Sequence, residues 1–383
     1  MKMSRKNLLD VIEGVAKPVI QDIIQDGHAK PGHNGLYHDP ETPVRNTAHW
    51  MVSFSRLYEI TGNPQYLETL EKGAEYLLNP IHRPDDFTIV SRNAPPKDRC
   101  NGLIGQAWVI EGLMAAYQIL KKDDYLKLAI NLFRLHPFDA GIGLWRIVEI
   151  DGKVLFFDPT FNHQLWFAWA GTLLADYDDE IRSQVHIFLD CINDNLTVQP
   201  DGLIYHPIEG LGRIRQKELP LKKKVKLLIK KMLKLTPAGQ DTEEIIIKSI
   251  GYHAFNTLAY RMIKSGIPDH TFWNSSKYHS IQNYMLKESY QEALEGNIYG
   301  YPYNPPGFEI PVSLSAEELR EAGIEPIAFY KHWIQQQFNH TYSVAENRFC
   351  RNNEDPNTLT ARLYEVLRLS NDVLKEITVN IEA

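Results

Sequence analysis

Apolar side chains recur every three or four positions over most of this chain, which is the period of an α-helix. Segments with this pattern come in pairs, joined by short turns that contain Gly, Pro, Asn or Asp. In each pair the first segment tends to be apolar all round, whereas the second has one apolar face. The pattern predicts helices over residues 46–60, 65–78, 102–120, 125–135, 160–175, 179–193, 243–265, 269–295, 326–338 and 357–377.

A chain of such hairpins predicts an all-α fold, an (α/α) toroid in which buried inner helices are ringed by amphipathic outer ones. Three stretches interrupt the helical pattern. Residues 144–158 alternate and turn at Asp151-Gly152, which predicts a β-hairpin, and residues 199–206 predict a turn and a short extended segment. Residues 299–309 are rich in proline and aromatic residues, and we expect a loop there. Insertions of this kind are expected on one rim of the toroid.

The domain organisation follows from what the chain lacks. No Gly/Ser-rich or Pro-rich linker divides it, so we expect one toroid domain over residues 1–383. A basic amphipathic insertion lies at about 213–235. One hypothesis is that this insertion makes peripheral contact with an anionic membrane, and the alternative is a solvated helix in a long loop.

Composition and charge narrow the classes of partner and cofactor. The net charge of −7 argues against nucleic acid as a partner. Three widely spaced cysteines and the lack of a long apolar run favour a cytoplasmic protein, with a peripheral position at the membrane as the alternative. The sequence has no phosphate-binding loop or dinucleotide fingerprint, so we expect no cofactor. His28, His33 and His38 are near one another, but their Gly/Pro-rich stretch has no metal-binding pattern, and we expect no metal.

The stretch from Asp158 to Gly171 carries the clearest chemical signal. Asp158 and Thr160 are both candidate N-caps of the helix that follows, and an Asn162-His163 pair begins this helix. The rest of the helix is apolar and contains Trp166 and Trp169. This arrangement predicts an amide and a titratable base at the mouth of a buried helix, where they can face a ligand.

Two segments resemble a known family. Phe161-Asn-His-Gln-Leu-Trp-Phe-Ala-Trp169 is similar to the Asn-Asn-His-x-Tyr-Trp signature of alginate-lyase-type polysaccharide lyases, which have an (α/α) toroid. Downstream, Lys248-Ser-Ile-Gly-Tyr-His-Ala-Phe-Asn-Thr-Leu-Ala259 resembles the Tyr-His-Asn-Tyr-Ala-Leu segment of the same group. The hairpin rhythm of the rest is similar to that of the broader six-hairpin carbohydrate-active enzymes.

The resemblance implies proton abstraction from C5 of a uronic acid residue in a glycan. In that chemistry Asn162 hydrogen-bonds the carboxyl group, while His163 and Tyr252 act as base and acid or share these roles. A cation assists with the carboxylate, and Lys248, Arg99 and Arg348 are the candidates. The three candidate catalytic residues are therefore Asn162, His163 and Tyr252.

Other candidate contacts gather where inner helices begin, because helix N-termini on one rim favour an anionic ligand. Further candidates come from the aromatic loop and from a second Asn-His pair near residue 340. The candidate substrate-binding residues are Arg45, His49, Trp50, Arg99, Asn101, Gln106, Trp108, Trp166, Lys248, His253, Tyr303, Asn304, Asn339, His340 and Arg348.

The sequence therefore favours an enzyme that acts on an acidic glycan by C5 proton abstraction and β-elimination. A uronyl C5-epimerase would use the same carbanion. A glycoside hydrolase on the same scaffold would need carboxylates, for which Asp158, Glu111 and Glu309 are the candidates. A glycan-binding protein without catalysis is the remaining alternative.

Overall fold

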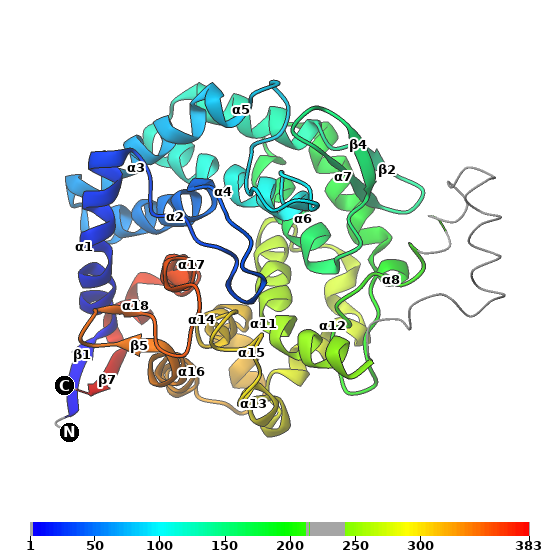
Figure 1. Cartoon of the computed structure of the whole chain (residues 1–383). Coiled ribbons are helices and arrows are strands. Elements are labelled where there is room, and N and C mark those ends of the chain that lie inside the picture. The colour runs from blue at the N-terminus through cyan, green and yellow to red at the C-terminus, as the bar shows by residue number, and fades with distance from the viewer. Residues whose placement is uncertain (1–2, 212–213, 215–241, 383) are drawn as a thin grey trace.

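The computed structural model describes residues 3–211, 214 and 242–382, and these residues form a ring of helices. Figure 1 looks down the axis of the ring, with the chain running once around it from blue to red. The inner helices lie close to the axis and the outer helices surround them. This arrangement confirms the predicted (α/α) toroid.

The inner layer is formed by six segments that follow one another around the ring. They are α2 (Val44–Thr61), α4 (Gly102–Leu120), α6 (Phe161–Leu174), α11 (Thr242–Gly266), α14 (Pro306–Ser313) and α17 (Pro356–Ala361) with its continuations η4 (Arg362–Tyr364) and η5 (Val366–Arg368). Nearly every residue of α4 and α6 is buried, as their uniformly apolar sequence predicts.

The outer layer covers the inner one with helices that bury one face. These helices are α1 (Leu8–Asp26), α3 (Pro64–Leu78), α5 (Asp123–Arg134), α7 (Asp179–Asp190), α12 (Ser276–Tyr284), α13 (Glu288–Leu294) and α16 (Pro326–Thr341). Further short helices are α8 (Ile192–Asn195), α15 (Ala316–Glu321) and α18 (Asn371–Glu376). Further one-turn segments are η1 (Gly35–Tyr37), η2 (Pro80–His82) and η3 (Thr271–Asn274).

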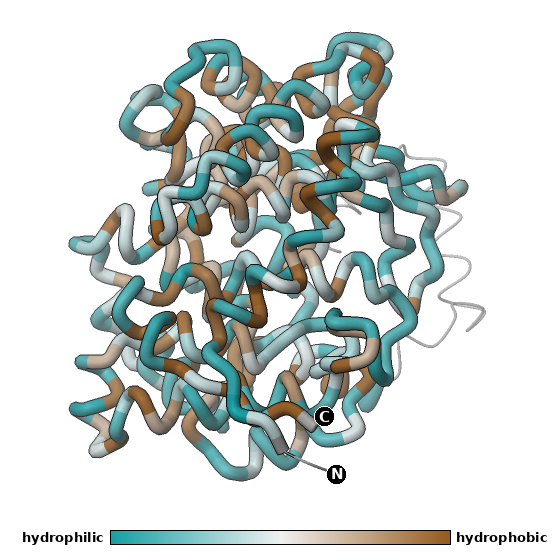
Figure 2. The backbone as a smooth tube through the Cα atoms, turned by 90° about the vertical axis from the view of Figure 1, so that its left-hand side faces the viewer, coloured by the Kyte–Doolittle hydropathy of each residue, from teal (hydrophilic) through white to brown (hydrophobic). Residues whose placement is uncertain are grey.

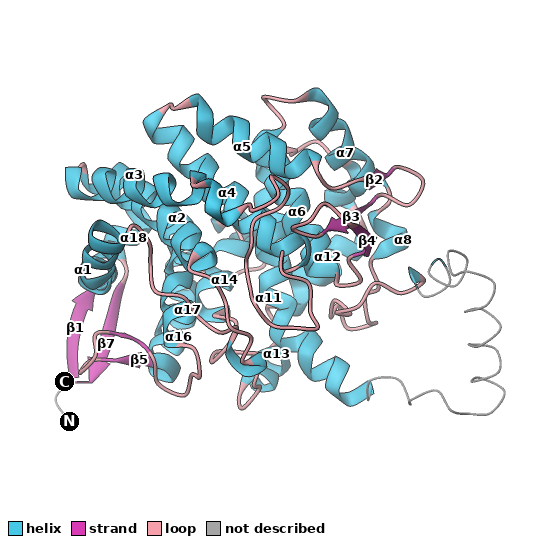
Figure 3. Ribbon diagram, turned by 45° about the horizontal axis from the view of Figure 1, so that its top comes forward, coloured by secondary structure: helices cyan, strands magenta, loops and turns pink. Residues whose placement is uncertain are grey.

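The strands are short, and Figure 3 shows them in magenta. At the two ends of the chain, β1 (Met3–Asn7) pairs antiparallel with β7 (Thr378–Glu382). The pairing brings the termini side by side, as Figure 2 also shows, and completes the ring. On the far side, β2 (Phe138–Asp139), β3 (Leu144–Val148) and β4 (Val154–Phe157) form a small sheet. The last pair joins β5 (Tyr342–Ser343) to β6 (Arg348–Phe349).

The hairpins turn where the sequence places capping residues. Helix α2 ends at Gly62, which has a φ of +68° that favours glycine. The side chain of Asn63 then accepts a hydrogen bond from the backbone N–H of Gln65, and Pro64 begins α3. Asp178 caps α7 in the same way. These local signals explain why the helix boundaries in the first half of the chain are close to those predicted.

Several predicted elements differ from the structure. The segment 269–295 is divided into η3, α12 and α13, because Ser275 caps a new helix and the chain turns at 285–287. The segment 357–377 is likewise divided into short helices. The expected loop 299–309 becomes helical from Pro306, since proline is well tolerated in the first turn. Helix α1 and the β1–β7 pair were not predicted.

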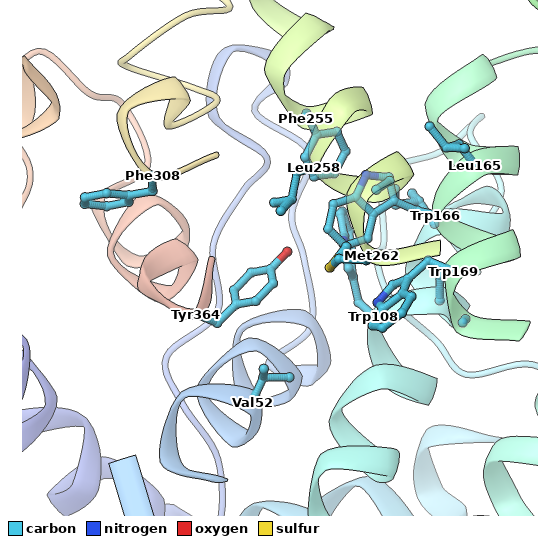
Figure 4. Close-up of a cluster of buried hydrophobic side chains, with 14 of the residues drawn as sticks. Val52, Trp108, Leu165, Trp166, Trp169, Phe255, Leu258, Met262, Phe308 and Tyr364 are labelled. Carbon is cyan, nitrogen blue, oxygen red and sulfur yellow. The ribbon is translucent and has the colours of Figure 1, made fainter. Parts of the chain in front are cut away.

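The core is continuous around the ring, and its centre is aromatic. Figure 4 shows Trp108, Trp166, Phe255 and Tyr364 converging from different inner segments. Trp166 and Phe255 are stacked, with ring centroids 4.4 Å apart. Along the backbone, hydrophobic stretches alternate with hydrophilic ones (Figure 2), as expected for helices that bury part of their surface.

Among the described residues, α4 alone is long and apolar enough to cross a membrane, and most of it is buried inside the protein. This burial is expected for the inner helix of a ring. The basic segment at 213–235 lies outside the described residues except for Ile214, so the hypothesis of a membrane contact there stays a prediction.

Candidate active site

A cavity opens at the end of the ring where the inner helices begin. Its wall is built from α2, α4, α6, α11, η4 and the loop before α14. The loop between α1 and α2, which extends toward the centre of the ring in Figure 1, contributes Asn34, Tyr37 and Asp39. The lining residues are Asn34, Tyr37, Asp39, Arg45, Arg92, Lys97, Asn101, Ile104, Trp108, Thr160, Asn162, His163, His206, Lys248, Tyr252, Phe255, Tyr303, Asn304 and Arg362.

All three candidate catalytic residues line this cavity. Asn162 and His163 belong to the first turn of α6, and Tyr252 comes from the first half of α11. The Oδ1 atom of Asn162 is buried and makes no hydrogen bond with any described residue. A buried amide oxygen without a partner is rare in proteins, so a ligand or a water molecule is expected to bind it.

His163 is held by Asp158. Its Nδ1 atom lies 2.8 Å from Oδ2 of Asp158, and the side chains are 24% and 3% exposed, respectively. The same carboxylate accepts hydrogen bonds from the backbone N–H groups of Leu103 and Thr160. Asp158 therefore orients the histidine instead of capping α6, and the Nε2 atom of His163 remains available to a ligand.

A second imidazole, that of His206, lies in the same cavity and was not among the predicted residues. The segment around it runs beside the start of α6: Phe161 N–H donates to the His206 carbonyl, and Ile208 N–H donates to the Pro159 carbonyl. The hydroxyl of Ser249 on α11 accepts from His206 N–H at 3.0 Å. The sequence predicts a short extended segment here, but not that it pairs with the Asn162-His163 turn.

Burial keeps His206 neutral. Loss of solvent, and next the positive charge of Lys248, hold the pKa of His206 well below its usual range. The Nδ1 atom of His206 has no hydrogen-bond partner among the described residues. Its ring lies 4.6 Å from that of Tyr252. A neutral imidazole can accept a proton, so the cavity contains two potential bases, His163 and His206.

Tyr252 remains protonated at neutral pH. Burial and the neighbouring Tyr303 and Tyr37 raise the pKa of its hydroxyl well above the usual value. Tyr252 can therefore donate a proton or a hydrogen bond, and it is poorly suited to act as a base at neutral pH.

Positive charge dominates the cavity wall. Among its described lining residues, Arg45, Arg92, Lys97, Lys248 and Arg362 are cationic, whereas Asp39 is the single carboxylate. The N-terminal turns of α2, α4 and α6 add partial positive charge from their backbone N–H groups. The arrangement can accommodate an anionic ligand.

Part of the predicted substrate-binding set lines the cavity, and the structure brings these residues together from α2, α4, α11 and the loop before α14. They are Arg45, Asn101, Trp108, Lys248, Tyr303 and Asn304. Arg45 lies over the Trp108 ring, 4.1 Å from its centroid.

Several predicted contacts instead lie in the core behind the cavity, because inner-helix residues also face neighbouring helices. His253 is fully buried, and its ring nitrogens bond the backbone of Ile204 and Ile281. Gln106 bonds only backbone groups of the loop before α4. His49 stacks on Tyr364, and the fully buried Trp166 stacks on Phe255.

Other predicted contacts lie at distant parts of the ring. Trp50 and Arg348 line a separate cavity between α1 and α17. Arg99 is exposed to solvent and is not a lining residue of the first cavity. Asn339 is exposed on α16, and His340 stacks on Tyr301, away from the lining residues. These positions share one cause: the short Asn-His and Arg-containing motifs are local patterns, and they do not show which face of a helix looks into the ring.

The three carboxylates considered for hydrolysis bind other side chains of the protein. Asp158 binds His163, and Glu309 binds the buried Arg362. Glu111 binds the indole N–H of Trp169 and the guanidinium of Arg368. None of the three is a lining residue of the cavity described above.

The sequence is similar along almost its whole length to a protein named for glycosylation. Archaeal glycosylation protein Q of Haloferax volcanii is 34% identical over 369 residues, which cover 95% of this chain and 97% of that protein. The chain belongs to the family of archaeal glycosylation protein Q. No protein-family model matches the chain.

Solved structures share the fold at low sequence identity. A sugar epimerase from a ruminal bacterium has a TM-score of 0.64 at 12% identity, and the match covers 94% of this chain and 98% of that one. Cellobiose 2-epimerase of Bacillus thermoamylovorans also has a TM-score of 0.64, at 10% identity, with coverage of 96% and 99%. An α-1,6-mannanase of Salegentibacter has a TM-score of 0.57 at 11% identity, with coverage of 97% and 100%. These likenesses show that the fold is the (α/α)6 toroid.

Proposed function

We propose that this protein is a carbohydrate-modifying enzyme that removes a carbon-bound proton from a sugar residue and returns it, as an epimerase or isomerase does. The observation that carries the proposal is the presence of two imidazoles, those of His163 and His206, in one cavity. The relative of this chain is named for glycosylation, which supports a carbohydrate substrate. Lys248, a cation of the cavity wall that makes no ion pair with any described residue, favours an acidic sugar such as a uronic acid.

The proposed reaction begins at a carbon next to a carbonyl or carboxyl group. One imidazole takes the proton from this carbon, and the electron pair of the broken C–H bond moves into an enolate. Lys248 and the amide of Asn162 stabilise the negative charge that develops on its oxygen. His163, in the imidazolium form that Asp158 stabilises, then donates its proton to the same carbon from the opposite face, which inverts the configuration. Neutral His206 is in this scheme the imidazole that takes the first proton.

His163 and His206 are suited to proton transfer for different reasons. His163 is oriented by Asp158, whose carboxylate also stabilises the imidazolium that forms when His163 takes up a proton. His206 is neutral because it is buried and lies near Lys248. A positioned acid or base of this kind contributes about 10²–10⁴-fold to the rate.

Elimination is a second candidate, and Tyr252 is the observation that favours it. Its phenol lines the cavity and remains protonated, so it could give a proton to the leaving glycosidic oxygen at C4 of a uronate. The two similarities to alginate-lyase-type enzymes contain His163 and Tyr252, and they motivate the same reaction. Both candidates share the first proton abstraction.

Hydrolysis is less well supported. It requires two carboxyl groups beside the scissile bond. Among the described lining residues, Asp39 is the single carboxylate, and Lys97 binds both of its oxygens.

Incubation with uronate-containing and neutral oligosaccharides in D2O tests these candidates together. Deuterium on a sugar carbon without new ultraviolet absorbance supports epimerisation or isomerisation. Absorbance from a 4,5-unsaturated uronyl product supports elimination. New reducing ends without either signal, or no change with a substrate that binds, would overturn the proposed proton transfer.

A further inference from the structure

Lys248 lies in the cavity under a cage of tyrosines. It is one helical turn before Tyr252 on α11. Its Nζ atom lies 5.3 Å from the ring centroid of Tyr37, 5.8 Å from that of Tyr252 and 5.7 Å from that of Tyr299. Aromatic rings at these distances attract an ammonium group, and they hold it in place without neutralising its charge.

The other four cations of the cavity have carboxylate partners. Arg45 pairs with Glu41 at 3.0 Å, and Lys97 pairs with Asp39 at 2.7 Å. Arg92 pairs with Asp98 at 2.7 Å.

Arg362 is the fourth paired cation, and it binds both Glu309 and Glu365. Burial raises the pKa of both glutamates, that of Glu365 to about 7, so they carry less than two full charges at neutral pH. In each of the four cases the positive charge is largely balanced before any ligand binds.

Lys248 differs from these four cations because it makes no hydrogen bond or ion pair with any described residue. The acidic side chain that acts on it electrostatically is Glu244, which is exposed to solvent. Burial lowers the pKa of Lys248 from its ordinary value, and nearby Lys97 acts in the same direction. A half-buried ammonium without a directly bonded carboxylate is unfavourable, and an anionic ligand would relieve this cost.

We propose that Lys248 is the specificity-determining residue of this cavity and that it binds the carboxylate of a uronic acid. One unbalanced positive charge matches one negative charge, whereas a phosphate monoester carries about −1.5 to −2 at neutral pH. This inference rests on the proposed function, since it assumes that the cavity receives a sugar.

The position of Lys248 also indicates how the sugar lies. Lys248 and His206 both lie close to the Tyr252 ring, whose centroid is 5.8 Å from the Lys248 Nζ atom and 4.6 Å from the centroid of the His206 ring. A carboxylate held by Lys248 would lie beside His206, so the carbon bonded to that carboxylate, C5 of a uronate, would be the one presented to the neutral imidazole. The cation would then also stabilise the charge that forms on the carboxylate when the C5 proton leaves.

Equilibrium binding tests this inference without any turnover. The probes are methyl β-glucuronide, methyl β-glucoside and glucose 1-phosphate, added to the full chain and followed by calorimetry. The uncharged glucoside has a hydroxymethyl group where the glucuronide has its carboxylate. A hydrogen bond to a charged group typically changes affinity by about ten- to a hundredfold. We therefore expect the glucuronide to bind at least ~10-fold more tightly than the glucoside.

Lys248→Met should abolish this preference for the glucuronide while leaving the affinity for the glucoside nearly the same. Lys97→Met is the matched control, because it removes another lysine of the same cavity whose charge is already balanced by Asp39. The control should keep the preference for the glucuronide. Circular dichroism and thermal unfolding confirm that both variants are folded.

Three results would overturn the assignment: equal binding of the glucuronide and the glucoside by the unaltered protein, a preference that survives Lys248→Met, or tighter binding of glucose 1-phosphate than of the glucuronide. The outcome is independent of the proposed proton transfer. A protein that binds the glucuronide through Lys248 but exchanges no deuterium would refute the proposed function and leave this inference standing.

Discussion

The imidazole of His163 is hydrogen-bonded to the carboxylate of Asp158 across 2.8 Å, and both groups lie against Gly102. Gly102 has a φ of +59° at the beginning of α4. A Cβ atom at this position would come within 2.4 Å of Asp158 Oδ2 and 3.0 Å of His163 Nδ1. The His163–Asp158 pair therefore packs directly against Gly102, and any side chain at position 102 would collide with the pair.

Replacing His163 tests the role of the imidazole. His163→Ala should reduce deuterium exchange into the sugar about 10²–10⁴-fold, the usual contribution of a general base. The side chain is partly exposed, so its removal should change the free energy of unfolding little. Exchange rates and urea unfolding measure the two effects, and an unchanged exchange rate would show that His163 takes no part in the proton transfer.

Gly102→Ala tests the contact between this glycine and the pair. A Cβ there must displace Asp158 or His163, and it also has to adopt a left-handed backbone conformation that costs about 1–2 kcal/mol. We expect this variant to lose at least ~10-fold in activity, since a small misplacement of a catalytic group is costly.

The control is Gly62→Ala, because Gly62 has a φ of +68° and a Cβ added there would meet nothing within 4 Å. It should lose similar stability through the same backbone strain but keep its activity. Equal activity losses in the two variants would mean that strain alone, and not the displaced pair, is responsible.

Acid should destabilise the protein between about pH 6.5 and pH 4. Burial lowers the pKa of both His136 and His253 from 6.5 to about 4. In that interval the unfolded chain binds protons that the folded chain does not, so the free energy of unfolding falls as the pH falls. Each group contributes a slope of up to about 1.4 kcal/mol per pH unit.

His253 provides the variant for this experiment. Its Nδ1 atom accepts from Ile204 N–H, and its Nε2 atom faces the Ile281 carbonyl, so a proton on Nδ1 would be opposed to the Ile204 N–H group. His253→Gln should make the pH dependence of urea unfolding shallower, with the exposed His279→Gln as the control. If the free energy of unfolding depends on pH in the same way for His253→Gln and the unaltered protein, His253 is not a source of the acid destabilisation.

Trp166→Ala tests the aromatic centre of the ring. Trp166 is fully buried and stacked on Phe255, so its truncation leaves a large void. We expect a loss of about 3–5 kcal/mol in the free energy of unfolding by urea. Tyr177→Ala, at a side chain that is 46% exposed, should change the stability by about 0.5 kcal/mol or less. If Trp166→Ala lowers the free energy of unfolding by no more than Tyr177→Ala does, the surrounding helices must repack to fill the void.

Part of the candidate site could be predicted from the sequence. Asn162 and His163 stand at the start of a helix that is apolar all round, and this position alone predicts that they face the open end of a ring. His206 could not be found in this way. It lies in a short extended segment whose pairing with residues 159–161 is a contact between distant parts of the chain.

Local sequence was sufficient for the helical hairpins in the first half of the chain, for the distinction between inner and outer helices there, and for the turns at residues such as Gly62 and Asp178. These features follow from the period of apolar residues and from capping, which act over a few residues. Three relationships became visible only in the folded chain: His163 and His206 share a cavity, Asp158 orients a histidine instead of capping α6, and Lys248 lacks a carboxylate partner among the described residues. They depend on how separate hairpins meet around the axis, and local periodicity contains no information about which distant charges come into contact.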